Sequence, residues 1–240
     1  MTVPASKVEK QPLSFDADIL AKMGTLFTRV VAASQLATLV PDIYKTQLKE
    51  TGFYIAVLDE RHNNQAAAFC RLVRSDQSPD SAGFESARNF GSDCLIASHP
   101  DQCFLEIGPF AFLSAQKRHR CHGLLWQSIA SYCQKENIDY VIGCMPFKGK
   151  YPAVYALALS YLHHNYRAQP DLLAKAKSGV TMDIMPAEAI NPEIGFASLP
   201  PVLRYCLRHG AKVGDGVVVD HSLEQIKLFV IVPAKKVGLH

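Results

Sequence analysis

The chain has 240 residues, of which 48% are apolar and 20% charged, and its formal net charge is +3. This composition excludes a largely disordered chain and a small scaffold that needs disulfides or a metal to fold. No run reaches the ~18 consecutive apolar residues of a membrane span, and residues 1–11 lack the apolar segment of a signal peptide, so we expect a cytoplasmic protein. The seven cysteines form no CxxC pair, which favours free thiols and predicts no metal site.

The first third of the chain predicts an arm, helices and a hairpin. Residues 1–15 are polar with two prolines and predict a flexible arm, which leaves residues 16–240 as one domain. Residues 16–39 are rich in alanine, leucine and valine and predict one or two helices. The apolar runs 53–58 and 65–73 flank a turn-forming cluster and predict two hairpin strands.

The rest of the chain predicts an α+β domain. Residues 74–103 are irregular, and a loop of that length is usually functional or contains short elements. The apolar pattern predicts strands at 104–113, 138–145, 180–185 and 226–232, and helices at 124–136, 151–164 and 202–209. Gly214-Asp215-Gly216 is a signal for a tight turn. No internal repeat or clean linker divides this series.

One strand contains an isolated acid beside residues that disturb a sheet. Glu106 stands among apolar neighbours and is followed by Gly108 and Pro109. Glycine packs nothing and proline donates no ladder hydrogen bond, so we expect a bulge, a feature common beside active sites. A half-buried carboxylate has a raised pKa, which suits a general base for an amine. The alternative is an edge carboxylate paired with an arginine.

A basic stretch, residues 116–123, leads into the next predicted helix. Residues 107–135 and 141–170 contain no acid, so a basic face is expected, and it predicts an acidic or phosphorylated partner. A helix N-terminus also binds phosphate through its free N–H groups. The alternative is an ordinary solvated positive end. The basic residues lack the interleaved exposed aromatics of single-strand binders, so we expect no nucleic acid partner.

The order of strand, bulge, basic turn, helix and a strand with Gly143-Cys144 resembles the core of GNAT acyltransferases. A longer ordered series over residues 104–233 is similar to the bacterial ornithine lipid N-acyltransferases, also called lyso-ornithine lipid synthases. These form a GNAT-like group with the N-acyl amino acid synthases. The motifs of the series are Phe104-Leu105-Glu106-Ile107-Gly108, Leu124-Leu125-Trp126, Ile142-Gly143-Cys144, Leu159 to Tyr166, Leu199-Pro200-Pro201, Leu203 to Gly210, Val213 to Asp220, and Phe229 to Pro233.

The resemblance implies a fold and an activity. The fold would be an α/β GNAT-like one, with a mixed, mostly antiparallel sheet splayed near Gly108 and helices on both faces. The activity would be transfer of a long 3-hydroxy fatty acyl group from acyl carrier protein to the α-amine of ornithine or a similar amino acid, as the first step in making an amino-acid lipid. The donor would be an acyl-phosphopantetheine thioester on acyl carrier protein or coenzyme A. No tightly bound cofactor and at most peripheral contact with the inner membrane are expected.

The resemblance also implies roles for individual residues. Glu106 would be the base or amine-binding group, and His163 and His164 match the family's paired histidines and would belong to the acceptor or acyl site. The alternative for this pair is contact with helix carbonyls. The residues implied in donor binding are Gly108, Phe110, Lys117, Arg118, Arg120, Gly123, Leu124 and Cys144.

Two positions depart from the family pattern. Pro109 stands where the family has arginine, and residues 26–31 match the family's early helix motif poorly. Two further hypotheses therefore accompany amino acid N-acylation. One is the same chemistry on another amine, such as a polyamine. The other is a non-catalytic module that binds acyl carrier protein.

Overall fold

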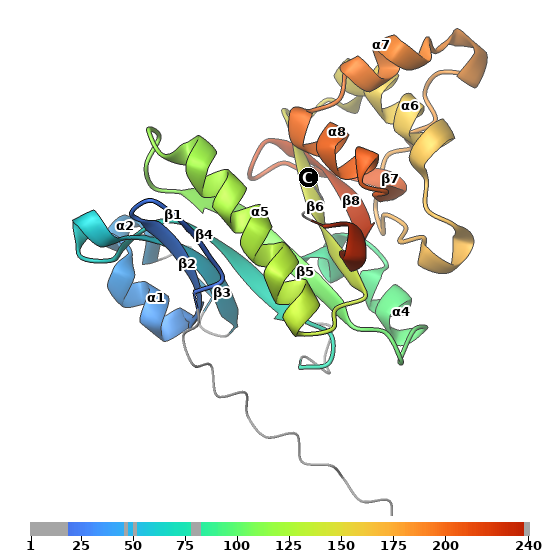
Figure 1. Ribbon diagram of the computed structural model, residues 1–240. Coiled ribbons are helices and arrows are strands. Elements are labelled where there is room, and N and C mark those ends of the chain that lie inside the picture. The colour runs from blue at the N-terminus through green and yellow to red at the C-terminus, as the bar shows by residue number, and fades with distance from the viewer. Residues whose placement is uncertain (1–18, 46–47, 50–51, 78–82, 238–240) are drawn as a thin grey trace, which may run out of the picture.

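The computed structural model describes residues 19–45, 48–49, 52–77 and 83–237 (Figure 1). In these residues eight strands form one mixed sheet in the order β1-β2-β3-β4-β5-β6-β8-β7. Neighbouring strands are antiparallel except for β5 and β6, which are parallel. The strands are β1 Ala21–Met23, β2 Leu26–Ala32, β3 Phe53–Asp59, β4 Gln65–Arg74, β5 Phe104–Phe112, β6 Tyr140–Lys148, β7 Lys212–Asp220 and β8 Gln225–Pro233.

Helices cover both faces of this sheet. The helices are α1 Ala33–Leu39, α2 Asp42–Lys45, α3 Glu85–Asn89, α4 Ser92–Ala97, α5 Arg118–Lys135, α6 Ala156–Tyr166, α7 Pro192–Ala197 and α8 Pro201–Arg208. Short 3-10 turns occur at Glu60–His62, Pro152–Tyr155, Pro170–Leu172, Ala187–Ala189 and Ala234–Lys236.

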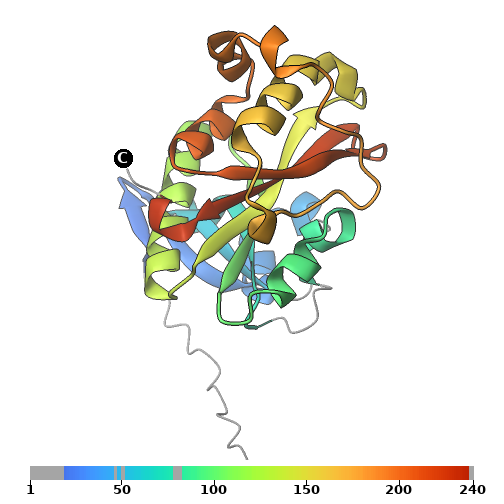
Figure 2. The same cartoon turned by 90° about the vertical axis from the view of Figure 1, so that its right-hand side faces the viewer.

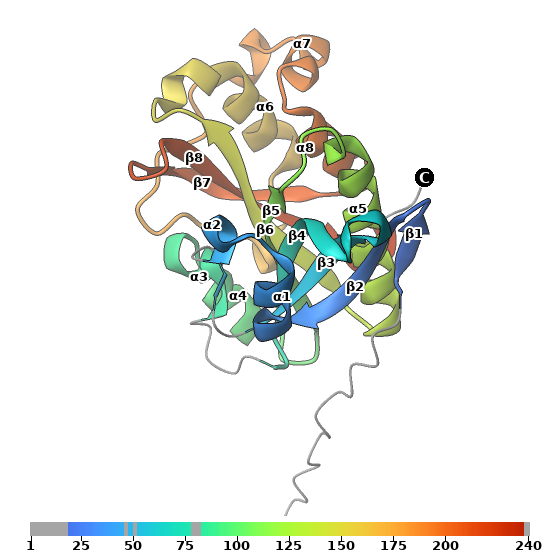
Figure 3. The same cartoon turned by 90° about the vertical axis from the view of Figure 1, so that its left-hand side faces the viewer.

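Side chains that alternate along a strand enter different cores. Leu105 of β5 and Val141 of β6 pack in the cluster that contains buried residues of α5 and α8. Their neighbours Phe104 and Ile142 pack instead with buried residues of α3 and α4, on the other face (Figure 2). Figure 3 shows α1 and α5 on opposite sides of β2 and β3, where a third cluster lies under α1. Burial on both faces explains why these strands consist of nearly continuous apolar runs.

The parallel pair β5 and β6 separates partway along its length. Their register has three partners, of which Glu106 and Ile142 are the last. Beyond that point β5 remains paired with β4, and β6 remains paired with β8. A Cβ on Gly143 would lie 3.1 Å from the carbonyl oxygen of Ile107, so glycine permits the close approach where the separation begins. The expected splay between these two strands is confirmed.

A bulge interrupts β5 beside the splay. The register of β4 and β5 shifts between Cys70 and Leu72, opposite Gly108 and Pro109. A Cβ on Gly108 would lie 3.0 Å from the Cβ of Arg71, tighter than most carbon contacts, so the bulge favours glycine there. The predicted bulge is therefore present. The mixed and mostly antiparallel α/β sheet expected from the sequence is also confirmed.

Several predicted elements are wrong. The helices expected over 16–39 are mostly strands β1 and β2, and only residues 33–39 are helical, because Leu26–Ala32 pairs along its whole length with β3. The strand expected at 180–185 is a single bridge from Val180 to Val217. Gly214-Asp215-Gly216 forms a bulge within β7 rather than a hairpin turn, with Gly216 at φ +84°.

Other sequence predictions stand as follows. The hairpin β3–β4 and the strands β5, β6 and β8 are confirmed, and α5 begins at Arg118 rather than at 124. In the part of the chain that the structure describes, no helix has both the length and the apolar character of a membrane span. The predicted arm, residues 1–15, lies outside the described residues, and the division into one domain stays a prediction.

Candidate active site

Two cavities lie on either side of β5 at its bulge. The larger, of about 640 Å³, occupies the splay between β5 and β6. The smaller, of about 210 Å³, lies beside β4. Five residues line both cavities, and they are Glu85, Glu106, Gly108, Pro109 and Phe110. The bulged segment of β5 is therefore a thin wall between two spaces, and Glu106 borders both.

The larger cavity has an aromatic wall. The Phe110 and Trp126 rings lie edge to face with centroids 5.5 Å apart, and His122 lies 5.8 Å from Phe110. Nε1 of Trp126 donates a hydrogen bond to Nε2 of His122 at 3.2 Å, so that nitrogen is an acceptor and the ring is neutral. Burial, and then the charges of His119 and Arg118, lower the pKa of His122. Such a wall suits an apolar chain better than a charged group.

The first turns of α5 border the opening of this cavity. Arg118 lines it, with its guanidinium 5.0 Å from the ring centroid of Phe112. Lys117 turns away and forms an ion pair with Asp59 at the end of β3. Burial raises the pKa of Asp59, but hydrogen bonds from Lys117, the Arg61 N–H and His62 outweigh it and lower the pKa to about 2. Lys117 thus anchors α5 to the β3–β4 hairpin.

The structure brings half of the predicted donor residues to the cavity. Gly108, Phe110, Arg118 and Cys144 line it, whereas Lys117, Arg120, Gly123 and Leu124 do not. The reason is the earlier start of α5, which places Leu124 in its second turn, where the side chain is fully buried in the core. Burial raises the pKa of the Cys144 thiol to about 12, so this cysteine is a wall residue and not a thiolate nucleophile at neutral pH.

Glu106 is buried and accepts three hydrogen bonds. Its carboxylate accepts hydrogen bonds from the backbone N–H groups of Glu85, at 2.6 Å, and Ser86, at 2.9 Å, and from the Ser86 hydroxyl. Burial raises the pKa of Glu106, and the bonds from Ser86 and Glu85 oppose that rise. The partners of the Glu106 carboxylate are thus the first residues of α3, and not the arginine considered from the sequence. A carboxyl group with a raised pKa at the border of two cavities can exchange a proton with a ligand in either.

A buried lysine contacts Glu85. Lys227 is 8% exposed, and its Nζ lies 3.1 Å from Oε1 of Glu85 and 3.1 Å from Oδ2 of Asp220. Burial lowers the pKa of Lys227, but the hydrogen bonds that Lys227 donates to Asp220 and Glu85 outweigh it and raise the pKa. The lysine therefore holds Glu85, a residue that lines both cavities, in place.

The smaller cavity combines cations and acids. Lys49 and Arg71 line it together with Glu85 and Glu106, and Nη1 of Arg71 donates to the carbonyl of Gly83 at 3.1 Å. Its remaining walls include Tyr54 and other apolar side chains. Opposite charges in a space of about 210 Å³ suit a small zwitterion rather than a long chain.

Sequence reasoning missed part of this arrangement. Glu85, Arg71 and Lys227 lie on α3, β4 and β8, far from the motif strand along the chain. The available signal was the presence of one charged residue inside each of two apolar strands, Arg71 in β4 and Lys227 in β8. Conversely, the structure places His163 and His164 at the end of α6, and neither lines either of these two cavities.

Comparison with known proteins found no family model that matches the chain. The chain is 40% identical over 170 residues to the L-ornithine N(alpha)-acyltransferase of Rhizobium meliloti, covering 70% of this chain and 57% of that protein. It is 36% identical over 187 residues to the protein of the same name from Brucella abortus, covering 77% and 66%. The chain thus spans about three fifths to two thirds of the length of these curated relatives.

Among solved structures, an N-acyl amino acid synthase from uncultured soil microbes, FeeM, matches over 87% of this chain and 91% of its own. The sequence identity is 8% and the TM-score is 0.42. A likeness at that score carries no argument about function.

Proposed function

From its similarity to two L-ornithine N(alpha)-acyltransferases, at 40% and 36% identity, we propose that the chain transfers an acyl group from a thioester to the amine of an amino acid. One observation carries the proposal. A larger, mostly apolar cavity and a smaller, charged cavity share a wall at the bulge of β5, and Glu106 borders both. A reaction between a lipid-like donor and a small amine needs two such spaces that share one proton-accepting group.

In the proposal the donor occupies the larger cavity. The backbone groups of β5 and β6 that face each other beyond Glu106 and Ile142 have no partner in the other strand, and an extended pantetheine arm would pair with them. The aromatic wall and Val202 of α8 would contact the acyl chain. Arg118, at the start of α5, would bind the phosphate of the arm.

The acceptor occupies the smaller cavity. Its α-carboxylate would pair with Arg71 and Lys49, and its amines would face Glu85 and Glu106. A polyamine has no carboxylate, and its charges would meet those two cations. The charge pattern therefore favours an amino acid over a polyamine, and two carboxylates suit an acceptor with two amines, such as ornithine.

The reaction is a direct attack. Glu106 takes a proton from the acceptor ammonium, and the free amine attacks the thioester carbonyl. A C–N bond forms and the C–S bond breaks, and the departing thiolate takes the proton that the attacking nitrogen loses, which gives the amide and the pantetheine thiol. Backbone N–H groups at the Gly108 bulge stabilise the oxyanion. The reaction needs neither a covalent enzyme intermediate nor a redox step.

We further propose acyl carrier protein as the donor and an amino-acid lipid as the end product. Arg118 and Arg120 are exposed at the start of α5, and residues 107–135 contain no acid. An acidic carrier protein that delivers its arm to the larger cavity would contact this positive end. His163 and His164 take no part in this proposal because they lie outside both cavities.

The test uses purified protein with a 3-hydroxyacyl thioester on acyl carrier protein or on coenzyme A. L-Ornithine, its decarboxylated diamine and other amino acids are offered as acceptors, and mass spectrometry identifies the products. We expect N-acylornithine, with a lower KM for the carrier-protein donor. Transfer to the diamine at the same kcat/KM would contradict the acceptor assignment. If the protein transfers no acyl group to any amine but still binds acyl carrier protein, it is a non-catalytic binding module instead.

A further inference from the structure

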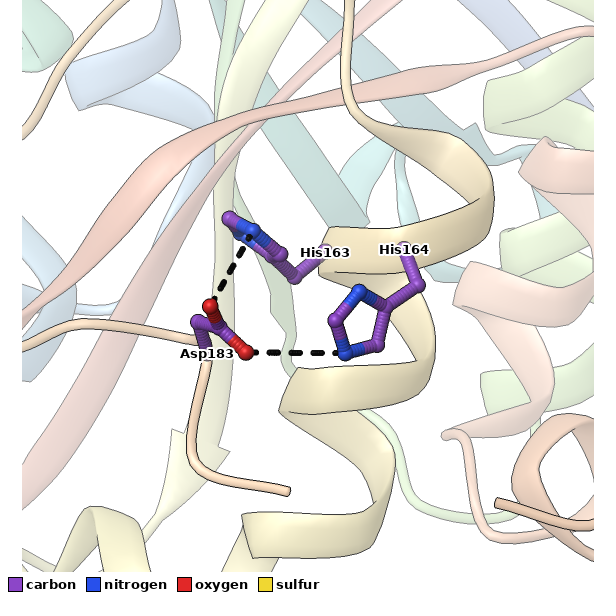
Figure 4. A group of neighbouring side chains, drawn as sticks. All are labelled: His163, His164 and Asp183. Carbon is purple, nitrogen blue, oxygen red and sulfur yellow. Dashed lines mark ion pairs between the residues drawn. The ribbon is translucent and has the colours of Figure 1, made fainter. Parts of the chain in front are cut away.

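Two adjacent histidines at the end of α6 face one carboxylate on the segment that follows Met182 (Figure 4). Nε2 of His163 lies 4.0 Å from Oδ2 of Asp183, and Nε2 of His164 lies 3.5 Å from Oδ1 of the same residue. The three ligand atoms lie within 4.8 Å of one another. Two ligand atoms of a tetrahedral Zn²⁺ ion lie about 3.4 Å apart. Closing the cluster on an ion therefore takes a movement of about 1 Å by the more distant ligand atoms, which the exposed side chain of Asp183 can make.

A buried serine holds the carboxylate in this position. The hydroxyl of Ser160 donates to the carbonyl of Met182 at 3.1 Å and accepts from the backbone N–H groups of Ile184, at 3.1 Å, and Met185, at 2.9 Å. Ser160 is fully buried and lies three and four residues before the two histidines, on the same face of α6. The backbone on both sides of Asp183 is thus fixed against the helix that carries His163 and His164.

A second carboxylate faces the other nitrogen of His163. Nδ1 of His163 is buried and makes no hydrogen bond in the described residues, and Oδ1 of Asp215 lies 3.9 Å from it. Asp215 also lies 3.9 Å from Nη1 of Arg167, which neutralises part of its charge. A carboxylate behind a histidine is the usual way in which a metal-ligating ring is oriented. Asp215 therefore has the place of a positioning residue, not of a ligand.

From this geometry we infer that His163, His164 and Asp183 bind one divalent transition-metal ion, such as Zn²⁺. Two imidazoles and one carboxylate are a donor set for Zn²⁺, Co²⁺ or Ni²⁺ rather than for Mg²⁺ or Ca²⁺, which prefer oxygen ligands. Asp183 has a 55% exposed side chain, so water can complete the coordination. None of the three residues lines either cavity, so the ion would not take part in acyl transfer.

The ion would replace one hydrogen bond and add a cross-link. Nε2 of His164 now lies 2.9 Å from the carbonyl oxygen of Met185, and metal binding would move the proton of that ring to Nδ1. In exchange the ion would tie the segment around Asp183 to α6 by bonds stronger than its hydrogen bonds. Because only the folded chain brings the three ligands together, the ion should raise the melting temperature as its concentration increases.

The test is calorimetric titration of the full chain, freed of metal with a chelator, with Zn²⁺ and separately with Mg²⁺. We expect one Zn²⁺ per chain and no saturable Mg²⁺ binding. His163→Gln, His164→Gln and Asp183→Asn should each weaken Zn²⁺ binding at least tenfold, and Asp215→Asn by about 10- to 100-fold. His119→Gln changes an exposed histidine of α5 and should leave binding unchanged.

Two controls keep the outcome clear. Exposed Cys94 is a competing ligand for Zn²⁺, so Co²⁺ is titrated as well, and its absorption spectrum should lack a thiolate charge-transfer band. Far-UV circular dichroism and thermal melting without metal show whether each variant folds. Asp183→Asn should disturb folding least, because the Asp183 side chain is exposed. Absence of one-to-one Zn²⁺ binding, or binding that survives Asp183→Asn and either histidine change in folded protein, would overturn the inference.

Discussion

Ser86 donates two hydrogen bonds to the same carboxylate oxygen of Glu106, one from its backbone N–H at 2.9 Å and one from its hydroxyl. The Glu106 carboxylate of β5 thereby holds the first turn of α3, which lies about twenty residues earlier in the chain. Glu106 thus has two tasks in the proposed enzyme, because it positions α3 and accepts a proton. Substitutions on the two sides of this contact separate the tasks.

Glu106→Gln should lower kcat by about 100-fold or more, the usual scale for a lost general base. The amide keeps one acceptor oxygen but places its NH₂ group against an N–H donor, so some stability is lost as well. Initial rates are therefore measured on protein that circular dichroism shows to be folded. A variant within a few-fold of the parent at every pH would remove Glu106 from the mechanism.

Ser86→Ala should shift the pH profile of kcat with little loss at its plateau. The hydroxyl stabilises the charged carboxylate, so removing it raises the pKa of Glu106 further. The base acts when deprotonated, and the acidic limb of the profile should therefore move to higher pH. Ser98→Ala, which removes a hydroxyl from the end of α4, is the matched control. A limb that stays in place would mean that another group titrates.

Arg71→Gln and Lys49→Gln should each raise the KM for the amino acid by about tenfold or more, because a charge-assisted hydrogen bond to its carboxylate is lost. The KM for the acyl thioester should not change, since these residues line only the smaller cavity. Lys45→Gln on α2, outside both cavities, should leave both KM values unchanged. A rise in the thioester KM alone would mean that the two substrates occupy the opposite cavities.

Replacing Arg118 and Arg120 together by glutamate should raise the KM for acyl carrier protein and flatten its salt dependence, because exposed charges mainly steer association. Lys117 is left intact in this experiment since its ion pair with Asp59 anchors α5. Lys175→Glu, at an exposed lysine after α6, is the control for a reversed charge elsewhere on the surface. A fall in kcat with an unchanged KM would place the arginines in the catalytic machinery instead.

The bulge in β5 could be predicted from local chemistry, whereas the pairing of distant segments could not. Gly108 and Pro109 disturb a ladder wherever they stand, so the bulge followed from two residues. The start of α3 as the partner of Glu106 depends on how residues 83–89 fold back onto β5, and no spacing in the sequence expresses that. Likewise, the apolar residues of Leu26–Ala32 are compatible with a helix or with a strand, and the pairing of this segment with β3 makes it a strand.

The thin wall formed by the β5 bulge has a consequence for kinetic order. The two substrates would reach Glu106 from two different cavities, so neither would have to leave before the other binds. Initial-rate plots should then intersect in the pattern of a ternary complex, not run parallel as in a ping-pong scheme. The N-acyl product would lie across the wall with a part in each cavity, which makes product departure a candidate for the slowest step of turnover.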